Sequence, residues 1–401
     1  MDRRRLAYGL TSNVVLLAIV SLLTDVSSEM ILPILPFFLM EVLLADAFIL
    51  GLVEGLAEGA VSFTKILSGR WSDAAGRRKR FVAAGYGLST VMKALFPFAA
   101  AWPHYLGMRV AERMGKGIRD APRDALLAES APPEVRGKAF GFHRSMDTTG
   151  AIAGPLIALG LLGWLGASFA VADAYRIVML FAAIPAAISL GLVFFVRETP
   201  RPPQAARPLR LSFRGAPRAL LTFVAIASLF SLAEFSYVFL LLRAGSDEGT
   251  TVAIALYVFF NVIYAAGAFP AGILSDRIGR KPVILVGYAC FSGMAGLLAA
   301  SPALPGLGLL LLAFALYGLS YGLTQGTERA LVADLAPPEI KATILGAYHT
   351  SVGFVKIASG IAAGLLWTVV LPAGTATFVF AFLVSSAATV AMLAWRAPVR
   401  S

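Results

Sequence analysis

The sequence predicts an all-α membrane protein of twelve transmembrane helices, arranged as two parallel six-helix repeats with both termini in the cytoplasm. Composition gives the first reason. Of the 401 residues, 58% are hydrophobic and 14% are charged, whereas soluble domains average about 25% charged residues. Such a chain has too little polar surface to cover its core in water, so the prediction places it in a membrane.

Long apolar runs give the second reason and define the individual helices. A run of about 20 apolar residues is typical of a membrane-spanning helix. Twelve such runs follow one another along the chain, at 14–40, 46–68, 81–101, 103–127, 139–163, 175–196, 219–242, 251–272, 282–301, 304–328, 343–369 and 374–395.

The distribution of positive charge sets the expected orientation. When the connecting segments are assigned alternately to the two sides, those on the side of the N-terminus hold 22 Lys and Arg residues. The segments on the opposite side hold about one, Arg243. This bias is typical of cytoplasmic loops. It explains the net charge of +11 without nucleic acid as a partner, and it predicts contact with anionic lipid headgroups at the plasma (inner) membrane.

An internal repeat gives the third reason. The segment GRWSDAAGRRKR at 69–80 recurs as GILSDRIGRKPV at 272–283, about 200 residues later, and such self-similarity indicates duplication. A second pair, DALLAESAPPEVRGKAFGF at 124–142 and RALVADLAPPEIKATILGA at 329–347, is also alike. We therefore predict an N-terminal bundle at 1–196, a cytoplasmic linker at 197–218 that is rich in Pro and Arg, and a C-terminal bundle at 219–401.

The repeated loop has the pattern G-x-x-x-D-x-x-G-R-R/K, and with it the chain resembles the major facilitator superfamily over essentially its whole length. That family moves solutes by alternating access, generally as a monomer. The resemblance implies that the loop acts as a cytoplasmic latch of the outward-open state, in which the acid pairs with Arg or caps a helix. The latch positions are Gly69, Asp73, Gly76 and Arg77, with Gly272, Asp276, Gly279 and Arg280.

Carboxylates inside the first two predicted helices are candidates for function, because charge within a membrane span is costly. Asp25 and Glu29 are four residues apart and therefore share one helical face. Burial away from water favours the neutral form of a carboxyl, which suits a proton carrier; the alternative is a static ion pair. Glu54 and Glu58 have the same spacing and either bind substrate in the cavity or form structural pairs.

The run at 103–127 has an unusual charged stripe, with positions 109, 112, 116, 119 and 123 on one face. Such a stripe must line water or pair with other helices. Antiporters of the superfamily have an embedded Arg in the fourth helix that is linked to proton coupling through a nearby carboxylate. Arg109 fits that position best and Arg113 is the alternative; we expect Glu112 and Arg113 to contribute to the substrate site.

The run at 139–163 contains His143 and Asp147, four residues apart. The pair is a candidate proton or metal ligand, with simple packing as the alternative, and Asp147 joins the coupling candidates. Gly150, Gly154 and Pro155 resemble the antiporter motif G-x-x-x-G-P, which allows close helix crossing. The second half lacks this proline, an asymmetry that resembles exporters of the superfamily.

The second half is less charged. Its polar and aromatic residues suit a substrate wall, although packing between helices is an equally good explanation for each. The candidates are Glu234, Tyr237, Asn261, Tyr264, Tyr321, Gln325 and Glu328.

Several classes of chemistry are not supported by any motif. The sequence has no P-loop for ATP, no zinc-spaced cysteines, one cysteine in all and three histidines, so we expect no cofactor, no resident metal and no enzyme activity. The favoured function is proton-coupled export of a small molecule. Three alternatives stay open: export of a metal ion or metal chelate, proton-coupled uptake of an organic anion, and a membrane receptor that does not transport.

Overall fold

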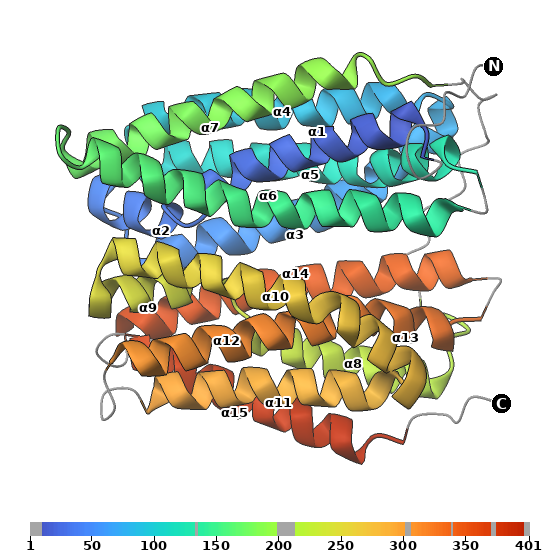
Figure 1. The fold of residues 1–401 in the computed structure, drawn as a ribbon. Helices are drawn as coiled ribbons and strands as arrows, with labels where there is room; N and C mark the ends of the chain where they lie inside the picture. Colours follow the sequence, from blue (N-terminus) through green and yellow to red (C-terminus); the bar gives the residue numbers. More distant parts are fainter. Residues whose placement is uncertain are drawn as a thin grey trace. The chain divides into compact units, whose positions relative to one another are not determined.

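The computed structural model of the chain describes residues 10–132, 135–198, 213–300, 306–337, 340–369 and 374–396, and the elements it defines there are helices (Figure 1). Most of the predicted linker, residues 199–212, lies outside the described residues, as do the two ends of the chain. Eleven helical stretches within the described ranges are long and apolar enough to cross a membrane. They are Ser12–Ile31, Ala47–Ala75, Arg78–Phe98, Arg136–Leu165, Val171–Val193, Arg218–Glu248, Thr250–Ile278, Arg280–Ala299, Leu307–Leu335, Thr343–Thr368 and Thr375–Ala394.

The first of two structural units comprises Met1–Leu44 and Leu56–Pro208. Within it, α4 packs against α5, and α1 packs against α6 and α7. Val20, Val82, Tyr86 and Val193 join α1, α4 and α7 in one buried apolar cluster. The elements are α1 (Ser12–Ile31), α2 (Leu35–Phe37), a π-helical turn (Phe38–Val42), most of α3 (Ala47–Ala75), α4 (Arg78–Leu95), a 3-10 turn (Phe96–Phe98), α5 (Trp102–Ser130), α6 (Arg136–Leu165) and α7 (Val171–Val193).

The second unit comprises Ala45–Gly55 and Leu209–Ser401. Its packing repeats that of the first unit, because α11 contacts α12 as α4 contacts α5, and α8 contacts α14 and α15 as α1 contacts α6 and α7. The elements are α8 (Arg218–Ala233), α9 (Val238–Glu248), α10 (Thr250–Ile278), α11 (Arg280–Ala299), α12 (Leu307–Thr324), α13 (Thr327–Leu335), α14 (Lys341–Val369) and α15 (Thr375–Ala394).

Helix α5, which covers the run predicted as the fourth span, is not among the eleven apolar stretches. Its 29 residues give a length of about 43 Å at 1.5 Å per residue, enough to cross a bilayer. Its charged residues lower its hydropathy, but Arg109, Glu112, Arg113, Arg119 and Asp120 are all buried within the structure. The charges of α5 therefore face protein, and its length still suits a twelfth span.

Two predicted spans of the second half are interrupted. The helix of 219–242 breaks between Ala233, where α8 ends, and Val238, where α9 begins. The helix of 304–328 breaks after Thr324 and resumes at Thr327 as α13. Irregular backbone at membrane depth is tolerated where it is buried in protein or lines a cavity, and transporters commonly place binding sites at such breaks.

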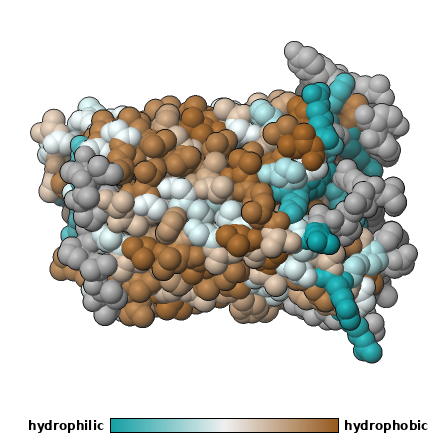
Figure 2. Space-filling view, turned by 90° about the horizontal axis from the view of Figure 1, so that it is seen from below, coloured by the Kyte–Doolittle hydropathy of each residue, from teal (hydrophilic) through white to brown (hydrophobic). Residues whose placement is uncertain are grey.

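One face of the molecule shows the surface that a membrane protein requires. Figure 2 shows hydrophobic residues across the middle of this face and hydrophilic residues gathered at one end. Among the described residues, large apolar side chains are exposed on several helices, for example Phe269 at 77% and Leu393 at 64%. Exposed apolar side chains of this size are stable against lipid and costly in water.

Candidate functional site

The two acids of α1 lie where α1 crosses α6. A Cβ atom built on Gly150 would lie 2.9 Å from the Cβ of Asp25, and one built on Gly154 would lie 2.7 Å from the Cβ of Glu29. The two glycines of α6 thus make room for the carboxyl-bearing face of α1. Asp25 makes no hydrogen bond or ion pair with any residue in the described ranges, so its carboxyl is available for a proton.

Asp147 lies one turn before Gly150 on α6 and acts electrostatically on Asp25. The structure brings it to His143, with 3.5 Å between Nδ1 and Oδ2, and to Arg144, whose Nη1 is 3.8 Å from the same oxygen. His143 is buried and its Nε2 has no hydrogen-bond partner among the described residues. The described part of the chain contains no group of three or more His, Cys, Asp or Glu that could hold a metal ion.

Arg109 on α5 forms a buried ion pair with Glu112, at 3.2 Å between Nη1 and Oε2. The positive charges that act most strongly on Asp25 belong instead to Lys116, Arg123 and Arg119. The predicted partnership of Arg109 with a coupling carboxylate therefore has a competitor in the part of the stripe from Lys116 to Arg123.

The rest of the α5 stripe is paired across the first unit. Arg113 forms an ion pair with Glu58 of α3. Arg119 donates to Ser89 Oγ of α4 at 2.7 Å and lies 4.6 Å from the centre of the Tyr86 ring. Ser89 in turn donates to the carbonyl of Glu112 at 2.9 Å. These bonds turn the charged face of α5 toward the other helices of the first unit. This orientation is expected because a charged stripe cannot face lipid.

Lys93 of α4 is a member of this site that the sequence analysis missed. Its side chain is 1% exposed. Its Nζ donates to Ser28 Oγ at 2.8 Å, to Ser27 Oγ at 3.1 Å and to the carbonyl of Thr24 at 3.4 Å, all on α1. One feature of the sequence could have revealed it, because Lys93 is the only charged residue in the apolar run 81–101.

The second unit holds its charges at the two helix breaks. Glu234 follows α8 and pairs with Lys356 of α14, at 2.8 Å between Oε2 and Nζ. Beside the same break, Ser236 donates to Glu54 Oε2 at 3.3 Å, and Glu54 is buried. Glu54 and Glu58 thus have different partners in these two contacts.

Glu328 lies in the first turn of α13, at the second break. Both of its carboxyl oxygens accept hydrogen bonds from tyrosines. Tyr288 of α11 donates to Oε1 at 2.8 Å, and Tyr348 of α14 donates to Oε2 at 2.7 Å. This environment is specific enough to be argued separately below.

The predicted aromatic wall forms a continuous cluster on α10 and α12. The Phe260 ring lies 5.0 Å from Tyr317 and 6.0 Å from Tyr321, and Tyr264 lies 5.1 Å from Tyr321. Tyr237 joins the cluster through Tyr257, at 5.0 Å. Two predicted amides are used locally instead: Asn261 donates to the carbonyl of Tyr257 at 3.2 Å, and Gln325 accepts from Arg329 at 3.5 Å.

The two signature loops share two features, a glycine with positive φ and an acid paired with an arginine. Gly76 and Gly279 both have positive φ, at 63° and 93°, a conformation that favours glycine. Asp73 pairs with Arg78 at 2.8 Å, and Asp276 pairs with Arg280 at 2.6 Å. The glycine that begins each motif differs, because a Cβ on Gly69 would lie 3.3 Å from Ala121, whereas one on Gly272 would meet nothing within 4 Å.

Neither acid of the signature loops caps the helix that follows its own loop, since α4 and α11 begin without a side-chain cap from their preceding residues. Glu198, which the sequence analysis did not single out, accepts hydrogen bonds from the backbone N–H groups of Arg78 and Lys79 in the first turn of α4. This carboxylate therefore complements the positive end of the helix dipole.

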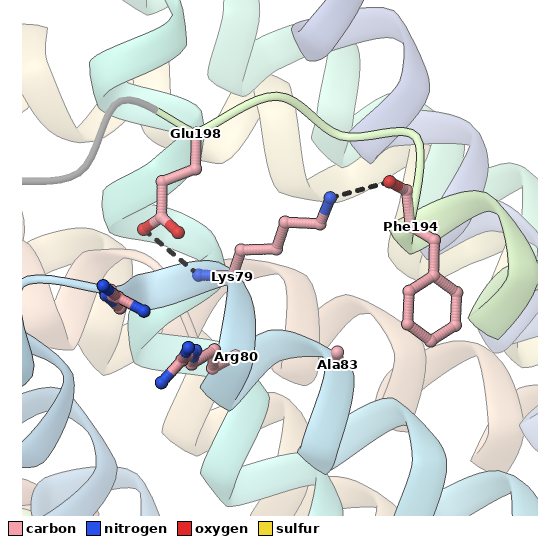
Figure 3. A pocket seen from close by; sticks show the side chains of 6 residues that line it. Lys79, Arg80, Ala83, Phe194 and Glu198 are labelled. Carbon is pink, nitrogen blue, oxygen red and sulfur yellow. Dashed lines mark hydrogen bonds between the residues drawn. The ribbon is translucent and has the colours of Figure 1, made fainter.

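A pocket of about 390 Å³ lies at this point (Figure 3). Lys79 spans it, with its Nζ donating to the carbonyl of Phe194 at 2.6 Å. Arg77 and Arg80 form no hydrogen bond or ion pair with any described residue, so within the described part of the chain the pocket has two guanidinium groups without a bonded partner. The lining residues are Arg77, Lys79, Arg80, Ala83, Phe194 and Glu198.

An all-helical chain with many apolar spans, two alike units and charges buried inside each has the architecture of a secondary transporter. The comparison with known families agrees, and the chain belongs to the Major Facilitator Superfamily, whose family model matches residues 17–360. It is a multi-pass membrane transporter of a small molecule and not an enzyme.

Two relatives illustrate the similarity in sequence. An uncharacterized MFS-type transporter of Methanocaldococcus jannaschii is 38% identical over 371 residues, which cover 90% of this chain and 89% of the relative. A probable 4-methylmuconolactone transporter of Cupriavidus pinatubonensis is 29% identical over 252 residues, covering 58% of this chain and 56% of the relative.

Solved structures show the same fold at low sequence identity. A variant of the nucleoside transporter NupG superposes with a TM-score of 0.81 at 16% identity, over 96% of this chain and 100% of that one. The D-xylose-proton symporter superposes with a TM-score of 0.76 at 16% identity, over 96% and 97%.

Proposed function

We propose that this transporter exports a small molecule in exchange for protons, by alternating access between its two units. The observation that carries the proposal is Asp25, a carboxyl in a membrane helix that has no bonded partner among the described residues and lies at a glycine-lined crossing with α6. An acid in this position can alternate between the protonated and the charged form. Glu29, Asp147 and Arg109 complete the proposed coupling group.

We further propose that the protein has twelve spans, with α5 as the fourth, and that both of its termini lie in the cytoplasm. We propose that it is a monomer in the inner membrane. We propose two further features. Residues on α10 and α12 contribute to substrate binding, and Arg77 and Arg80 contact lipid headgroups. The relative named for 4-methylmuconolactone supports an organic substrate over a metal ion.

Uptake is the second candidate for the direction of transport. The arginine-rich stripe of α5 supports an anionic substrate, and solved structures with this fold include one titled a D-xylose-proton symporter. A direct measurement of direction distinguishes the two. Inside-out and right-side-out vesicles are placed in the same external concentration of substrate under an imposed pH gradient. If the protein exports, proton-driven accumulation should occur only in the inside-out vesicles.

The coupling proposal is tested in two stages. A thermal-shift screen of metabolites, drugs and metal ions on the purified protein first supplies a substrate. Proteoliposomes then measure flux of that substrate under an imposed pH gradient and, separately, substrate exchange at equal pH. We expect Asp25→Asn or Glu29→Gln to abolish the gradient-driven flux and to leave part of the exchange, because the variants cannot bind and release the proton.

The matched control is Asp173→Asn, which removes an exposed acid at the start of α7 and should transport like the wild type. If Asp25→Asn, Glu29→Gln and the double variant all keep full gradient-driven flux, the coupling site lies elsewhere. If wild-type flux follows a sodium gradient and ignores the pH gradient, the proton proposal is wrong.

We also propose that the two signature loops act as a conformational latch. Asp73 and Asp276 are 53% and 65% exposed, and exposed ion pairs contribute only about 0–1 kcal/mol to stability. Asp73→Asn and Asp276→Asn should therefore leave the melting temperature nearly unchanged while slowing substrate exchange several-fold. Wild-type exchange rates in both variants, at equal amounts of protein, would contradict the latch.

A further inference from the structure

We propose that Glu328, in the second unit, is a second proton-binding site. The sequence analysis had instead given it as a candidate for the substrate wall. The inference rests on the proposed proton coupling for its role in transport, but proton binding itself can be tested without any substrate. The argument starts from the contacts of the carboxyl group.

The carboxyl of Glu328 is held from two sides by neutral O–H donors. Tyr288 and Tyr348 come from different helices, and each binds a different carboxyl oxygen, at 2.8 and 2.7 Å. Both tyrosines are buried, with exposed fractions of 0% and 3%. The Tyr288 ring also stacks on Phe230 of α8 with 3.7 Å between ring centres, so its hydroxyl is held in position.

Within the described residues Glu328 forms no ion pair, and its hydrogen-bond partners there are the two tyrosines. Lys356 of α14 acts on Glu328 electrostatically, but its ion pair is with Glu234, at 2.8 Å. Arg329, the neighbour of Glu328 in α13, is exposed and donates to Gln325. Glu234 itself is a like charge that acts on Glu328.

Among the helices that contact α13, α8 has one charged residue, Arg218 at its start, and α14 has Lys341 at its start besides Lys356. His349 of α14 lies beside Tyr348, with 5.3 Å between the ring centres. Helices α12 and α15 contain no charged residue. The charged residues of α10 are confined to Asp276 and Arg277 at its end, and those of α11 to Arg280 and Lys281 at its start. A half-buried carboxylate without an ion pair is costly, and binding a proton removes that cost.

Proton binding at Glu328 changes the bonds that join three helices. In the charged form, both oxygens accept from tyrosines. When a proton binds to one oxygen, that oxygen becomes an O–H donor, and the tyrosine facing it must turn or accept in place of donating, which a phenol can do. The link between α11, α13 and α14 is therefore rearranged, and α13 begins at a break where a helix can move.

The duplication shows that this chemistry belongs to the second unit alone. In the alignment of repeats that pairs Gly141 with Gly346, Tyr348 corresponds to His143 and Glu328 to Arg123. Arg123 is paired with Asp124 at 2.9 Å. The first unit thus has a paired cation where the second has an acid without a cation, so each unit has its own candidate proton site.

Infrared difference spectroscopy tests the proposal on the full chain reconstituted in lipid. A protonated carboxyl has a C=O stretch that a carboxylate lacks. The difference between spectra at acid and alkaline pH should contain a band from a buried carboxyl that Glu328→Gln removes. Tyr348→Phe and Tyr288→Phe keep the carboxyl but remove one hydrogen bond each, and should shift the same band to higher frequency.

Glu248→Gln is the control, because Glu248 is an exposed glutamate of the same unit and its loss should leave the band unchanged. A spectrum of Glu328→Gln that equals the wild-type spectrum would overturn the proposal. If Glu328→Gln does not fold, the two tyrosine variants decide: a shifted band supports the site, and an unshifted band overturns it.

Flux measurements separate this inference from the proposed function. Loss of gradient-driven flux in Glu328→Gln, with exchange retained, would support a role in coupling, and full gradient-driven flux in that variant would overturn it. If the band is present but wild-type flux does not respond to the pH gradient, the proposed proton coupling fails while Glu328 still stands as a proton-binding site.

Discussion

At the scale of single residues, Lys93 shows how a buried charge is made tolerable inside a helical bundle. Its ammonium group has three N–H donors, and the structure supplies three oxygens from one turn of α1. In the described part of the chain no carboxylate lies within ion-pair distance of Lys93. The lysine therefore joins α4 to the turn of α1 that carries Asp25 and Glu29, and fixes which face of α1 meets α6.

Removal of this group should weaken the first unit. A hydrogen bond to a charged group contributes about 1.5–3 kcal/mol, and truncation to alanine also leaves a cavity, so Lys93→Ala should lower stability by about 2–5 kcal/mol. Lys93→Met keeps most of the volume and should lose less. Lys138→Ala, at an exposed lysine of α6, is the control. Thermal unfolding in detergent measures all three, and equal midpoints for Lys93→Ala and Lys138→Ala would refute the role.

At the scale of helices, the crossing of α1 and α6 depends on glycine at defined positions. A Cβ on Gly154 would lie 2.7 Å from both the Cβ of Glu29 and the carbonyl of Val26, whereas a Cβ on Gly160, further along α6, would meet nothing within 4 Å. The same substitution on one helix therefore separates packing from helix propensity.

We expect Gly154→Ala to destabilise the protein and Gly160→Ala to be neutral or mildly stabilising. Overpacking typically costs about 1–3 kcal/mol, while alanine gains about 1 kcal/mol over glycine in a helix interior. The melting temperatures of the two variants should differ in opposite directions from the wild type. If Gly154→Ala melts at or above the wild-type temperature, the close crossing is not maintained in the membrane protein.

The helices themselves follow closely from the sequence, because apolar runs of bilayer length are a strong local signal. Pairs set by local spacing, such as His143 with Asp147, were also predictable from helical periodicity. The breaks at Glu234 and Gln325 were not, because no proline marks them. Each lies beside a contact with another helix, α14, and no single-segment pattern contains that information.

The bonded partners of the buried charges were unpredictable for the same reason. The sequence analysis named Arg113 and Glu58 as candidates for the substrate site but could not join them across the first unit. Arg109 shows the reverse case. The resemblance to antiporters assigned it to a coupling carboxylate, whereas the structure pairs it with Glu112, one turn along its own helix.

At the scale of the whole chain, duplication has preserved the scaffold and changed the chemistry. Equivalent helices pair in both units, and both signature loops use a glycine with positive φ and an acid bound to arginine. The buried charges differ, since the first unit has a dense stripe on α5 and the second has Glu234 and Glu328 at helix breaks. Two similar units with different titratable groups can respond differently to one proton gradient.

The orientation of the chain in its membrane remains the most direct test of the global proposal. Basic residues concentrate in the loops expected inside, including the loop after α3, and the opposite loops are nearly free of them. Single cysteines report the side of each loop once the one native thiol is removed by Cys290→Ser. Ala75, at the end of α3, and Ser246, near the end of α9, are both exposed and suit this purpose.

In intact cells, a thiol reagent that cannot cross the membrane should label Ser246→Cys and should label Ala75→Cys only after permeabilisation. Denatured samples labelled to the same extent control for expression and reactivity, and the Cys290→Ser background should remain unlabelled. The positive-inside bias predicts this pattern because basic segments are retained on the cytoplasmic side during insertion. The reverse pattern would show that the topology is inverted and that the latch is not cytoplasmic. Labelling of both positions from outside would show that α3 and α9 end on the same side. In that case α5 would not supply the twelfth span.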